Sequence, residues 1–167
     1  MKNINSIIKS HNTKTMQKSN EATSGKTCNC RSKPTCPLRG NCLVSNVVYK
    51  AKVTSSSANV FYIGLTGGTF KSRYLNHTKS FRKEKYQTET ELSKYIWNLK
   101  RKNVNYSINW DIVRKSNTHR RDSGLCNLCM EEKLQILSAK DKLINKRSEL
   151  LSTCLHNKRP PNRTKKK

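Results

Sequence analysis

Two tyrosines, an arginine and a histidine follow one another in this chain in an order that suits cleavage of a phosphodiester. Tyr49 ends one apolar run, and Tyr62 stands just before Gly64 in a second apolar run. Arg73 comes nine residues after Gly64, and His77 comes four residues after Arg73. Cleavage requires the removal of a proton from water and a fixed charge that stabilises the phosphoryl oxygens. Arginine supplies that charge with a geometry that matches phosphate.

Cleavage of this kind also uses a divalent metal, and the chain has few groups that could bind one. It has 10 acidic residues against 35 lysines and arginines, for a net charge of +25 over 167 residues. Mg²⁺ keeps several water ligands and takes only one or two protein carboxylates. Any catalytic carboxylate must therefore come from this small set.

The positive charge is spread over the whole chain and predicts a polyanionic partner, DNA or RNA first and an anionic membrane surface second. No apolar run approaches the roughly 18 residues of a membrane span, and the first 20 residues lack the apolar centre of a signal peptide. We expect an intracellular protein without a membrane partner. Basic runs at 157–159 and 165–167 favour a nuclear location.

The elements that must position these residues can be read from periodicity. Alternating apolar residues predict strands over 47–53 and 60–65, joined by a turn and ended by Thr66-Gly67-Gly68, and a third strand over 106–112. Apolar residues at helical spacing predict helices over 69–83 and 128–139. A further helix is expected between them, opened by a capping box of Thr88 and Glu91. Leu143 and Ile144 form a short last element before Asn145.

This order predicts an α+β fold, a small antiparallel three-stranded sheet flanked by helices, with a cysteine-rich zinc knuckle. The expected organisation is a disordered basic arm over 1–27, a cysteine-rich knuckle and linker over 28–46, a folded domain over 47–156 and a basic tail over 157–167. The arm is rich in lysine, asparagine, serine and threonine and has no aromatic residue.

Seven cysteines in an intracellular chain indicate metal binding, because disulfides are rare in reducing compartments. Cys126 and Cys129 have the spacing of half a zinc site, which Cys154 and His156 could complete. A second group could be formed by Cys28, Cys30, Cys36 and Cys42. Other groupings stay open, for instance Cys36 and Cys42 with His77. We expect at least one structural Zn²⁺.

Several stretches together resemble one known family. The motifs are Val47-Val48-Tyr49, Tyr62-Ile63-Gly64, Arg73 and His77, which resemble the GIY-YIG nuclease domain. Further matching stretches lie at 36–42, 91–97, 126–133 and 143–150. With these, the region from Cys28 to His156 is similar to the endonuclease domain of Penelope-like retroelements. One departure is the first tripeptide, which reads Val-Val-Tyr where the family has Gly-Ile-Tyr.

The resemblance implies a DNA-nicking endonuclease that depends on Mg²⁺ or Mn²⁺. It makes Tyr49 the base or water-positioning group, Tyr62 its partner and Arg73 the phosphate ligand. It assigns the catalytic metal to Glu132 and a site-shaping role to Asn145. Helical periodicity alone does not decide between Glu131 and Glu132, so the choice of Glu132 rests on the resemblance. As part of a mobile element, the chain would also work with a reverse transcriptase or its RNA template.

Each of these residues also has a purely structural interpretation. Tyr49 and Tyr62 could be packing aromatics of a sheet. Arg73 could be a solvated cation, and Glu132 an ordinary carboxylate on a helix surface. His77 lies one helical turn after Arg73 and could carry a proton, contact phosphate or simply pack. Two other functions therefore stay open: an inactive zinc-containing nucleic-acid-binding module and a basic structural protein.

Overall fold

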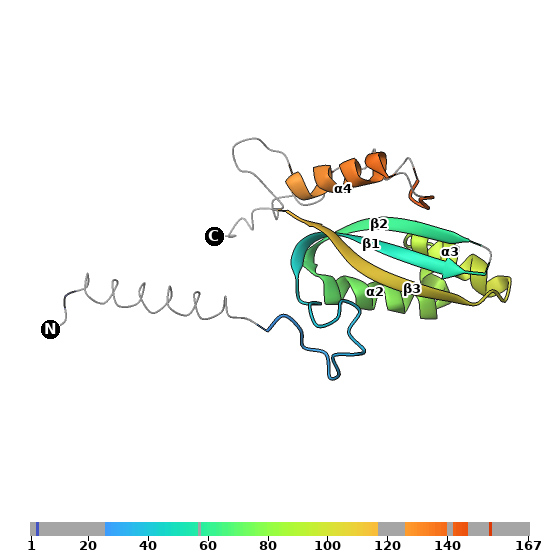
Figure 1. Ribbon diagram of the computed structural model, residues 1–167, viewed down its shortest axis with the longest axis horizontal. Coiled ribbons are helices and arrows are strands. Elements are labelled where there is room, and N and C mark those ends of the chain that lie inside the picture. Colours follow the sequence, from blue (N-terminus) through green and yellow to red (C-terminus); the bar gives the residue numbers. More distant parts are fainter. Residues whose placement is uncertain are drawn as a thin grey trace, which may run out of the picture.

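The computed structural model of the chain describes residues 26–56, 58–116, 126–139 and 142–146, together with Asn3 and Cys154. These residues form an α+β fold around a small three-stranded antiparallel sheet with helices on both faces (Figure 1). The predicted fold class is confirmed at this level. The predicted basic tail over 157–167 and nearly all of the predicted arm lie outside the described residues.

The sheet has the order β2-β1-β3, with β1 (Ser45–Ser55) in the middle, β2 (Asn59–Thr69) on one side and β3 (Tyr106–Lys115) on the other. The prediction that Thr66, Gly67 and Gly68 end the second strand is wrong. β2 extends to Thr69 because Thr66 and Thr69 still pair with β1. A bulge near the start of β1 separates these two pairs.

The helices are α2 (Phe70–Arg82), a 3₁₀ turn η2 (Glu84–Tyr86), α3 (Glu91–Arg101) and α4 (Asn127–Ser138). Thr69 caps α2 by accepting a hydrogen bond from the Ser72 amide. The predicted cap of α3 at Thr88 is wrong, because Thr90 accepts the bond from the Ser93 amide instead. The intervening 3₁₀ turn moves the start of the helix two residues along the chain.

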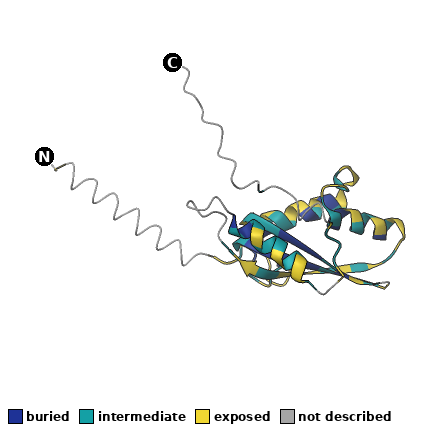
Figure 2. Ribbon diagram, turned by 90° about the horizontal axis from the view of Figure 1, so that it is seen from above, coloured by how far each residue is buried: buried dark blue, intermediate teal, exposed yellow. Residues whose placement is uncertain are grey.

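The two faces of the sheet pack against different helices. We call inner the face that carries Val47, Tyr49, Ala51 and Val53, because these residues form one core with α2 and α3. The outer face carries Val48 and Ile63, which pack against Leu128 of α4. Figure 2 shows the buried residues along the strands and along the sheet-facing sides of the helices. Among the described residues, no helix combines the length and apolar character needed to cross a membrane.

A short segment, 142–146, runs along the free edge of β2. The Phe61 amide donates to the Lys142 carbonyl at 3.0 Å, and the Ile144 amide donates to the Phe61 carbonyl at 2.9 Å. Leu143 therefore forms a parallel bridge with Phe61, which confirms the expected short last element. This bridge places Asn145 beside the middle of the Tyr62-Ile63-Gly64 tripeptide.

Candidate active site and metal centres

Tyr49 and Gly64 are direct partners across β1 and β2, and this pairing sets the geometry of the site. A Cβ atom on Gly64 would lie 2.6 Å from the Tyr49 hydroxyl oxygen and 2.9 Å from the Tyr62 ring. Real Cβ atoms do not approach other heavy atoms so closely. Gly64 therefore makes room for the Tyr49 hydroxyl, which is the structural reason for a glycine in this tripeptide.

Two side chains of α2 meet at the Tyr49 hydroxyl. Arg73 Nε donates to it at 3.0 Å, and His77 Nε2 lies 2.8 Å from it. Because arginine only donates, the phenol oxygen accepts from Arg73. The direction of its hydrogen bond with His77 Nε2 depends on the tautomer of the imidazole. The structure thus brings three of the candidate residues, Tyr49, Arg73 and His77, into direct contact.

Arg73 is partly buried and is held between the two tyrosines of the motif. Burial lowers the pKa of its guanidinium, but the contacts with Tyr49 and Tyr62 outweigh that effect and raise it. The same contacts fix the plane of the guanidinium. Tyr49 has no exposed surface, whereas Tyr62 retains 4%. Both phenols are therefore buried, Tyr49 completely and Tyr62 almost so.

His77 is a buried, neutral residue. Its side chain is 2% exposed and packs edge-on to both tyrosines while stacking on Phe81. Burial, with a smaller contribution from the charge of Arg73, lowers the pKa of His77 to about 3. An imidazole with this pKa is a poor proton carrier near neutral pH. The geometry favours the packed interpretation, in which His77 orients Tyr49.

Replacing Gly64 with alanine is expected to lower the free energy of unfolding by about 1–3 kcal/mol, since the new methyl group must displace the Tyr49 ring from a packed core. Urea denaturation measures this change. Gly68→Ala on the same strand is the matched control. Its Cβ would lie 3.9 Å from the nearest other atom, so the expected change is within about 0.5 kcal/mol. Equal effects of the two substitutions would contradict the close approach at Gly64.

Asn145 is a clamp on the second tripeptide. Its side-chain oxygen accepts from the Ile63 amide at 2.9 Å, and its side-chain nitrogen donates to the Ile63 carbonyl at 2.8 Å. The next residue, Lys146, forms a 3.2 Å ion pair with Glu91 at the start of α3. Asn145 therefore fixes the strand that carries Tyr62 and Gly64, in keeping with the site-shaping role expected of it.

Glu131 and Glu132 point in different directions from α4. Glu131 forms an ion pair with Arg114 of β3 at 3.3 Å and accepts from the Gln135 side chain at 2.9 Å. Glu132 is partly buried and lies four residues from both Leu128 and Ile136, which pack on the outer face of the sheet. It therefore shares their stripe of the helix, which faces the outer side of the sheet. The Tyr49 hydroxyl, which bonds Arg73 and His77, belongs to the inner side.

Four cysteines form a cluster in the loop that precedes β1. The sulfur atoms of Cys28, Cys30, Cys36 and Cys42 all lie within 4.8 Å of one another. Individual separations are 3.6 Å for Cys28–Cys36, 3.6 Å for Cys30–Cys42 and 3.5 Å for Cys28–Cys42. Tetrahedral Zn²⁺ with bonds of about 2.3 Å needs separations of about 3.8 Å. The cluster can therefore hold a metal ion such as zinc.

The surroundings of the cluster favour a thiolate at Cys36. Burial raises the pKa of Cys36, but backbone hydrogen bonds from Gly40 and Leu38 outweigh it and lower the pKa to about 6. Burial raises the pKa of Cys30, and that of Cys42 to about 12. Backbone donors to a sulfur atom, as at Cys36, are typical of metal–thiolate sites. The alternative grouping of Cys36 and Cys42 with His77 is wrong, because Cys28 and Cys30 complete the set and His77 bonds Tyr49.

The cysteine loop also holds the first turn of α2. The Phe70 amide donates to the Val44 carbonyl, and the Lys71 amide donates to the Cys42 carbonyl, both at 2.8 Å. The Lys71 ammonium reaches back to the Asn29 side chain at 2.6 Å. A metal bound by the cysteines would therefore fix the start of the helix that carries Arg73.

A second cluster joins α4 to the far end of the chain. The sulfur atoms of Cys126, Cys129 and Cys154 lie within 4.8 Å of one another, with 3.4 Å between Cys129 and Cys154. Three thiolates leave one position of a tetrahedral site for another ligand. The predicted fourth ligand, His156, lies outside the described residues. This cluster, too, can hold a metal ion.

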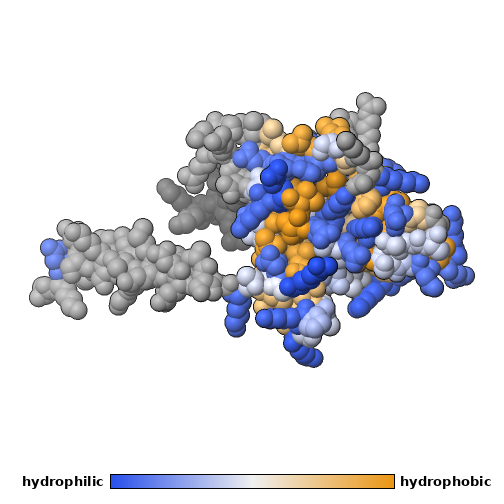
Figure 3. Space-filling view, viewed as in Figure 1, coloured by the Kyte–Doolittle hydropathy of each residue, from blue (hydrophilic) through white to orange (hydrophobic). Residues whose placement is uncertain are grey.

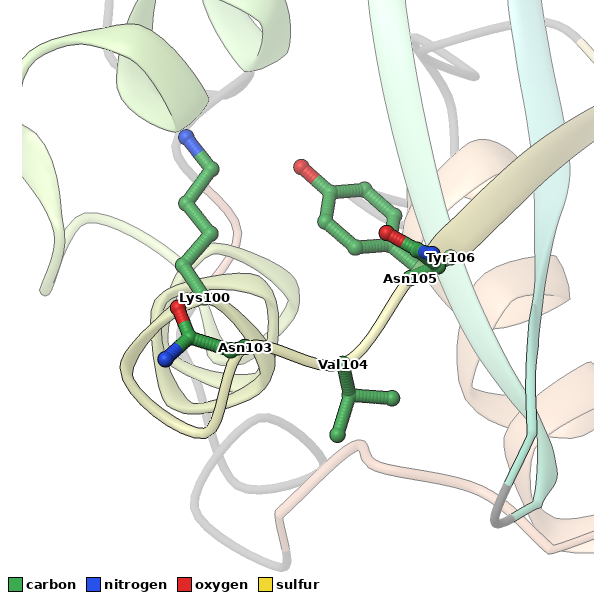
Figure 4. Close-up of a pocket in the computed structure, with 5 residues that line it drawn as sticks. All are labelled: Lys100, Asn103, Val104, Asn105 and Tyr106. Atoms are coloured by element: carbon green, nitrogen blue, oxygen red, sulfur yellow. The ribbon is translucent and has the colours of Figure 1, made fainter.

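The remaining surface contains no comparable set among the described residues. Figure 3 shows hydrophilic side chains over most of the face seen there, around a narrower apolar strip. A hollow at the α3–β3 connection is lined by Lys100, Asn103, Val104, Asn105 and Tyr106 (Figure 4). The Lys100 ammonium binds the Phe81 carbonyl and lies 4.6 Å from the Trp97 ring, so it is held away from catalytic use.

Sequence reasoning missed two residues that support the site. Trp110 packs against Tyr49 and His77, with ring centroids 5.8 and 5.3 Å away. Glu91 holds the segment of Asn145 through Lys146. The alternation of β3 placed Trp110 on the same sheet face as Ile108 and Ile112 but did not connect it to His77. No sequence signal links Glu91 to Lys146.

Comparison with models of known protein families, with curated proteins and with solved structures found no match to this chain.

Proposed function

We propose that this protein is a divalent-metal-dependent endonuclease that nicks DNA, with a site of the GIY-YIG type. The observation that supports it most is the junction at the Tyr49 hydroxyl, which accepts from Arg73 and is hydrogen-bonded to His77 in the space left by Gly64. Fixing a partly buried arginine between two buried phenols costs free energy, which suggests that the arginine has a function. Its charge and planar geometry suit the binding and stabilisation of a phosphoryl group.

The structure supports a division of labour between the two tyrosines. Tyr49 is fully buried, so we assign it the positioning of Arg73 in place of the direct base role that the family resemblance implied. Tyr62 also contacts Arg73 and is slightly less buried than Tyr49, so we assign it the removal of a proton from the attacking water. His77 completes the arrangement through its hydrogen bond to the Tyr49 hydroxyl.

Glu132 is the carboxylate that we assign to the catalytic metal. Mg²⁺ and Mn²⁺ prefer oxygen ligands, which the Glu132 carboxylate supplies. The carboxylate is partly buried on the apolar stripe of α4, where an apolar side chain would pack as well. When bound, the ion supplies positive charge to the phosphate and the leaving oxygen. Both carboxylates take part in interactions of the fold, so the choice of Glu132 over Glu131 rests on the family resemblance.

The proposed origin is a Penelope-like retroelement, supported by the motifs from Cys28 to His156. The substrate is DNA, in line with the net charge of +25. In that setting, a reverse transcriptase or its RNA template is the natural partner, and the nucleus the natural location. Zn²⁺ in the cysteine clusters has a structural role, because all of the ligands are protein thiolates in the four-cysteine site.

A second function is supported by two observations. The first tripeptide lacks its glycine, and the tyrosine that it carries has no exposed surface. Both fit a zinc-containing nucleic-acid-binding module in which this site only stabilises the fold. Such a module would bind DNA with a steep salt dependence and leave it intact.

The two functions are separated by a matched pair of variants, Glu132→Gln and Glu131→Gln, in a plasmid-nicking assay with Mg²⁺. We expect Glu132→Gln to lose nicking by at least about 100-fold and Glu131→Gln to keep it within a few-fold, since only the former removes a metal ligand. DNA affinity, measured alongside, should be similar for both. Equal nicking by the two variants would remove Glu132 from the site.

A further inference from the structure

The outer face of the sheet carries an aromatic ring between two lysines, away from the candidate active site. Phe61 of β2 pairs with Lys52 of β1 and projects on the face opposite to Tyr49. The Lys50 ammonium lies 4.0 Å from the centre of the Phe61 ring, and the Lys52 ammonium lies 6.0 Å from it. These distances are those of cation–π contacts. We call Lys50, Lys52 and Phe61 the outer-face platform.

The platform occupies the part of the outer face that α4 leaves uncovered. α4 packs over Val48 and Ile63, toward one end of the strands (Figure 1). Farther along the same face, β3 presents exposed polar side chains. Asn109 is the cross-strand neighbour of Lys52, and Asp111 that of Lys50. The result is a strip with an aromatic ring, two cations, the Asn109 amide and one anion, the Asp111 carboxylate beside Lys50.

The Phe61 ring stands on a rigid backbone. Its strand pairs with β1 on one side, and its own amide and carbonyl bond Lys142 and Ile144 on the other. A partly exposed phenylalanine held in this way presents its ring at little entropic cost. The lysines above it have flexible side chains that can swing from the ring to a nearby anion.

We propose that this platform binds single-stranded nucleic acid, with a base stacked on Phe61 and the adjacent phosphates contacted by Lys50 and Lys52. An aromatic ring with flanking cations on a sheet surface matches the two needs of a single strand, a stacking surface and charge for the backbone. A duplex does not fit, because its bases are already stacked on one another. The inference does not depend on the proposed nuclease function, since the platform and the Tyr49 cluster lie on opposite faces.

The test is fluorescence anisotropy with labelled dT15 and rU15 and with a duplex of the same length, in EDTA so that no cleavage can occur. Phe61→Leu keeps the apolar volume and removes the aromatic face, and Phe61→Tyr keeps both. We expect Phe61→Leu to weaken single-strand binding about 10-fold and to change duplex binding less than twofold, while Phe61→Tyr binds as the wild type does. The 15-mer that suffers the larger loss identifies DNA or RNA as the preferred strand.

Tyr86→Leu is the matched control, because the Tyr86 ring also lies under two lysines, Lys79 at 4.4 Å and Lys85 at 4.9 Å, but on the 3₁₀ turn. It should leave single-strand binding unchanged. Thermal unfolding of each variant shows whether the fold is kept. If a folded Phe61→Leu variant binds both single strands as tightly as the wild type, or if it weakens duplex binding equally, the platform is not a single-strand site.

If Phe61→Leu does not fold, the Lys50→Gln and Lys52→Gln double variant replaces it. That variant should lose single-strand affinity more than duplex affinity, and the reverse order overturns the proposal.

Discussion

Replacing Arg73 with alanine is expected to slow DNA nicking by about 100- to 1,000-fold, the usual effect of removing one preorganised donor from a charged transition state. Arg73 is the cation that both motif tyrosines orient, and its Nε hydrogen bond to Tyr49 is 3.0 Å long. Single-turnover nicking of a supercoiled plasmid measures the effect. Binding of the same plasmid should change little, because the other cations of the chain contribute most of the attraction to DNA.

Two further variants show whether the geometry of Arg73 matters as well as its charge. Arg73→Lys keeps the charge but loses the planar fork and the bond to Tyr49, so we expect it to recover only a small part of the activity. Arg82→Ala removes an exposed arginine from the other end of α2 and should nick as the wild type does. If Arg73→Ala and Arg82→Ala had equal effects, the Tyr49 junction would have no catalytic role.

Replacing Cys42 with serine is expected to remove one Zn²⁺ per chain and to destabilise the protein by several kcal/mol. Binding of structural zinc contributes of the order of 10 kcal/mol to folding in small metal domains, and Cys42 is the fully buried member of the cluster. Metal analysis by mass spectrometry gives the zinc content, and thermal unfolding with and without chelator gives the stability. The substitution should also slow nicking, because the Cys42 carbonyl accepts from the first turn of α2.

Two controls isolate the metal from other effects of the substitution. Thr35→Ala changes an exposed residue next to Cys36 and should keep the full zinc content. Cys129→Ser disrupts the other cluster and should leave the Cys28–Cys42 site loaded. A wild-type protein that contains no zinc, or a Cys42→Ser variant with unchanged zinc and stability, would contradict the metal assignment.

Strand and helix types could be predicted because the local pattern and the final packing agree. The alternating apolar residues from Val47 to Val53 predict one buried face of a strand, and in the structure the same residues face α2 and α3. The end of β2 could not be predicted from Thr66-Gly67-Gly68, because pairing with β1 outweighs the local preference of two glycines. The cap of α3 moved to Thr90 for a similar reason: the preceding 3₁₀ turn determines where the helix can begin.

The sequence could suggest which residues belong to the candidate site, but it could not show which of them contact one another. Spacing placed His77 one turn after Arg73, yet only burial shows that His77 is neutral and orients Tyr49. The grouping of the cysteines needed the path of the loop, because sequence spacing allowed several sets of four. Contacts between distant segments, such as Asn145 with Ile63, leave no periodic trace in the sequence.

The most direct test of the nuclease proposal is the appearance of open-circular DNA from supercoiled plasmid, followed over time with the wild-type protein and Arg73→Ala in parallel. We predict that the wild type produces nicked circles in Mg²⁺ or Mn²⁺ and stops when EDTA is added, while Arg73→Ala binds the plasmid and leaves it supercoiled. A folded, zinc-loaded wild type that binds DNA without nicking it in either metal would contradict the proposal.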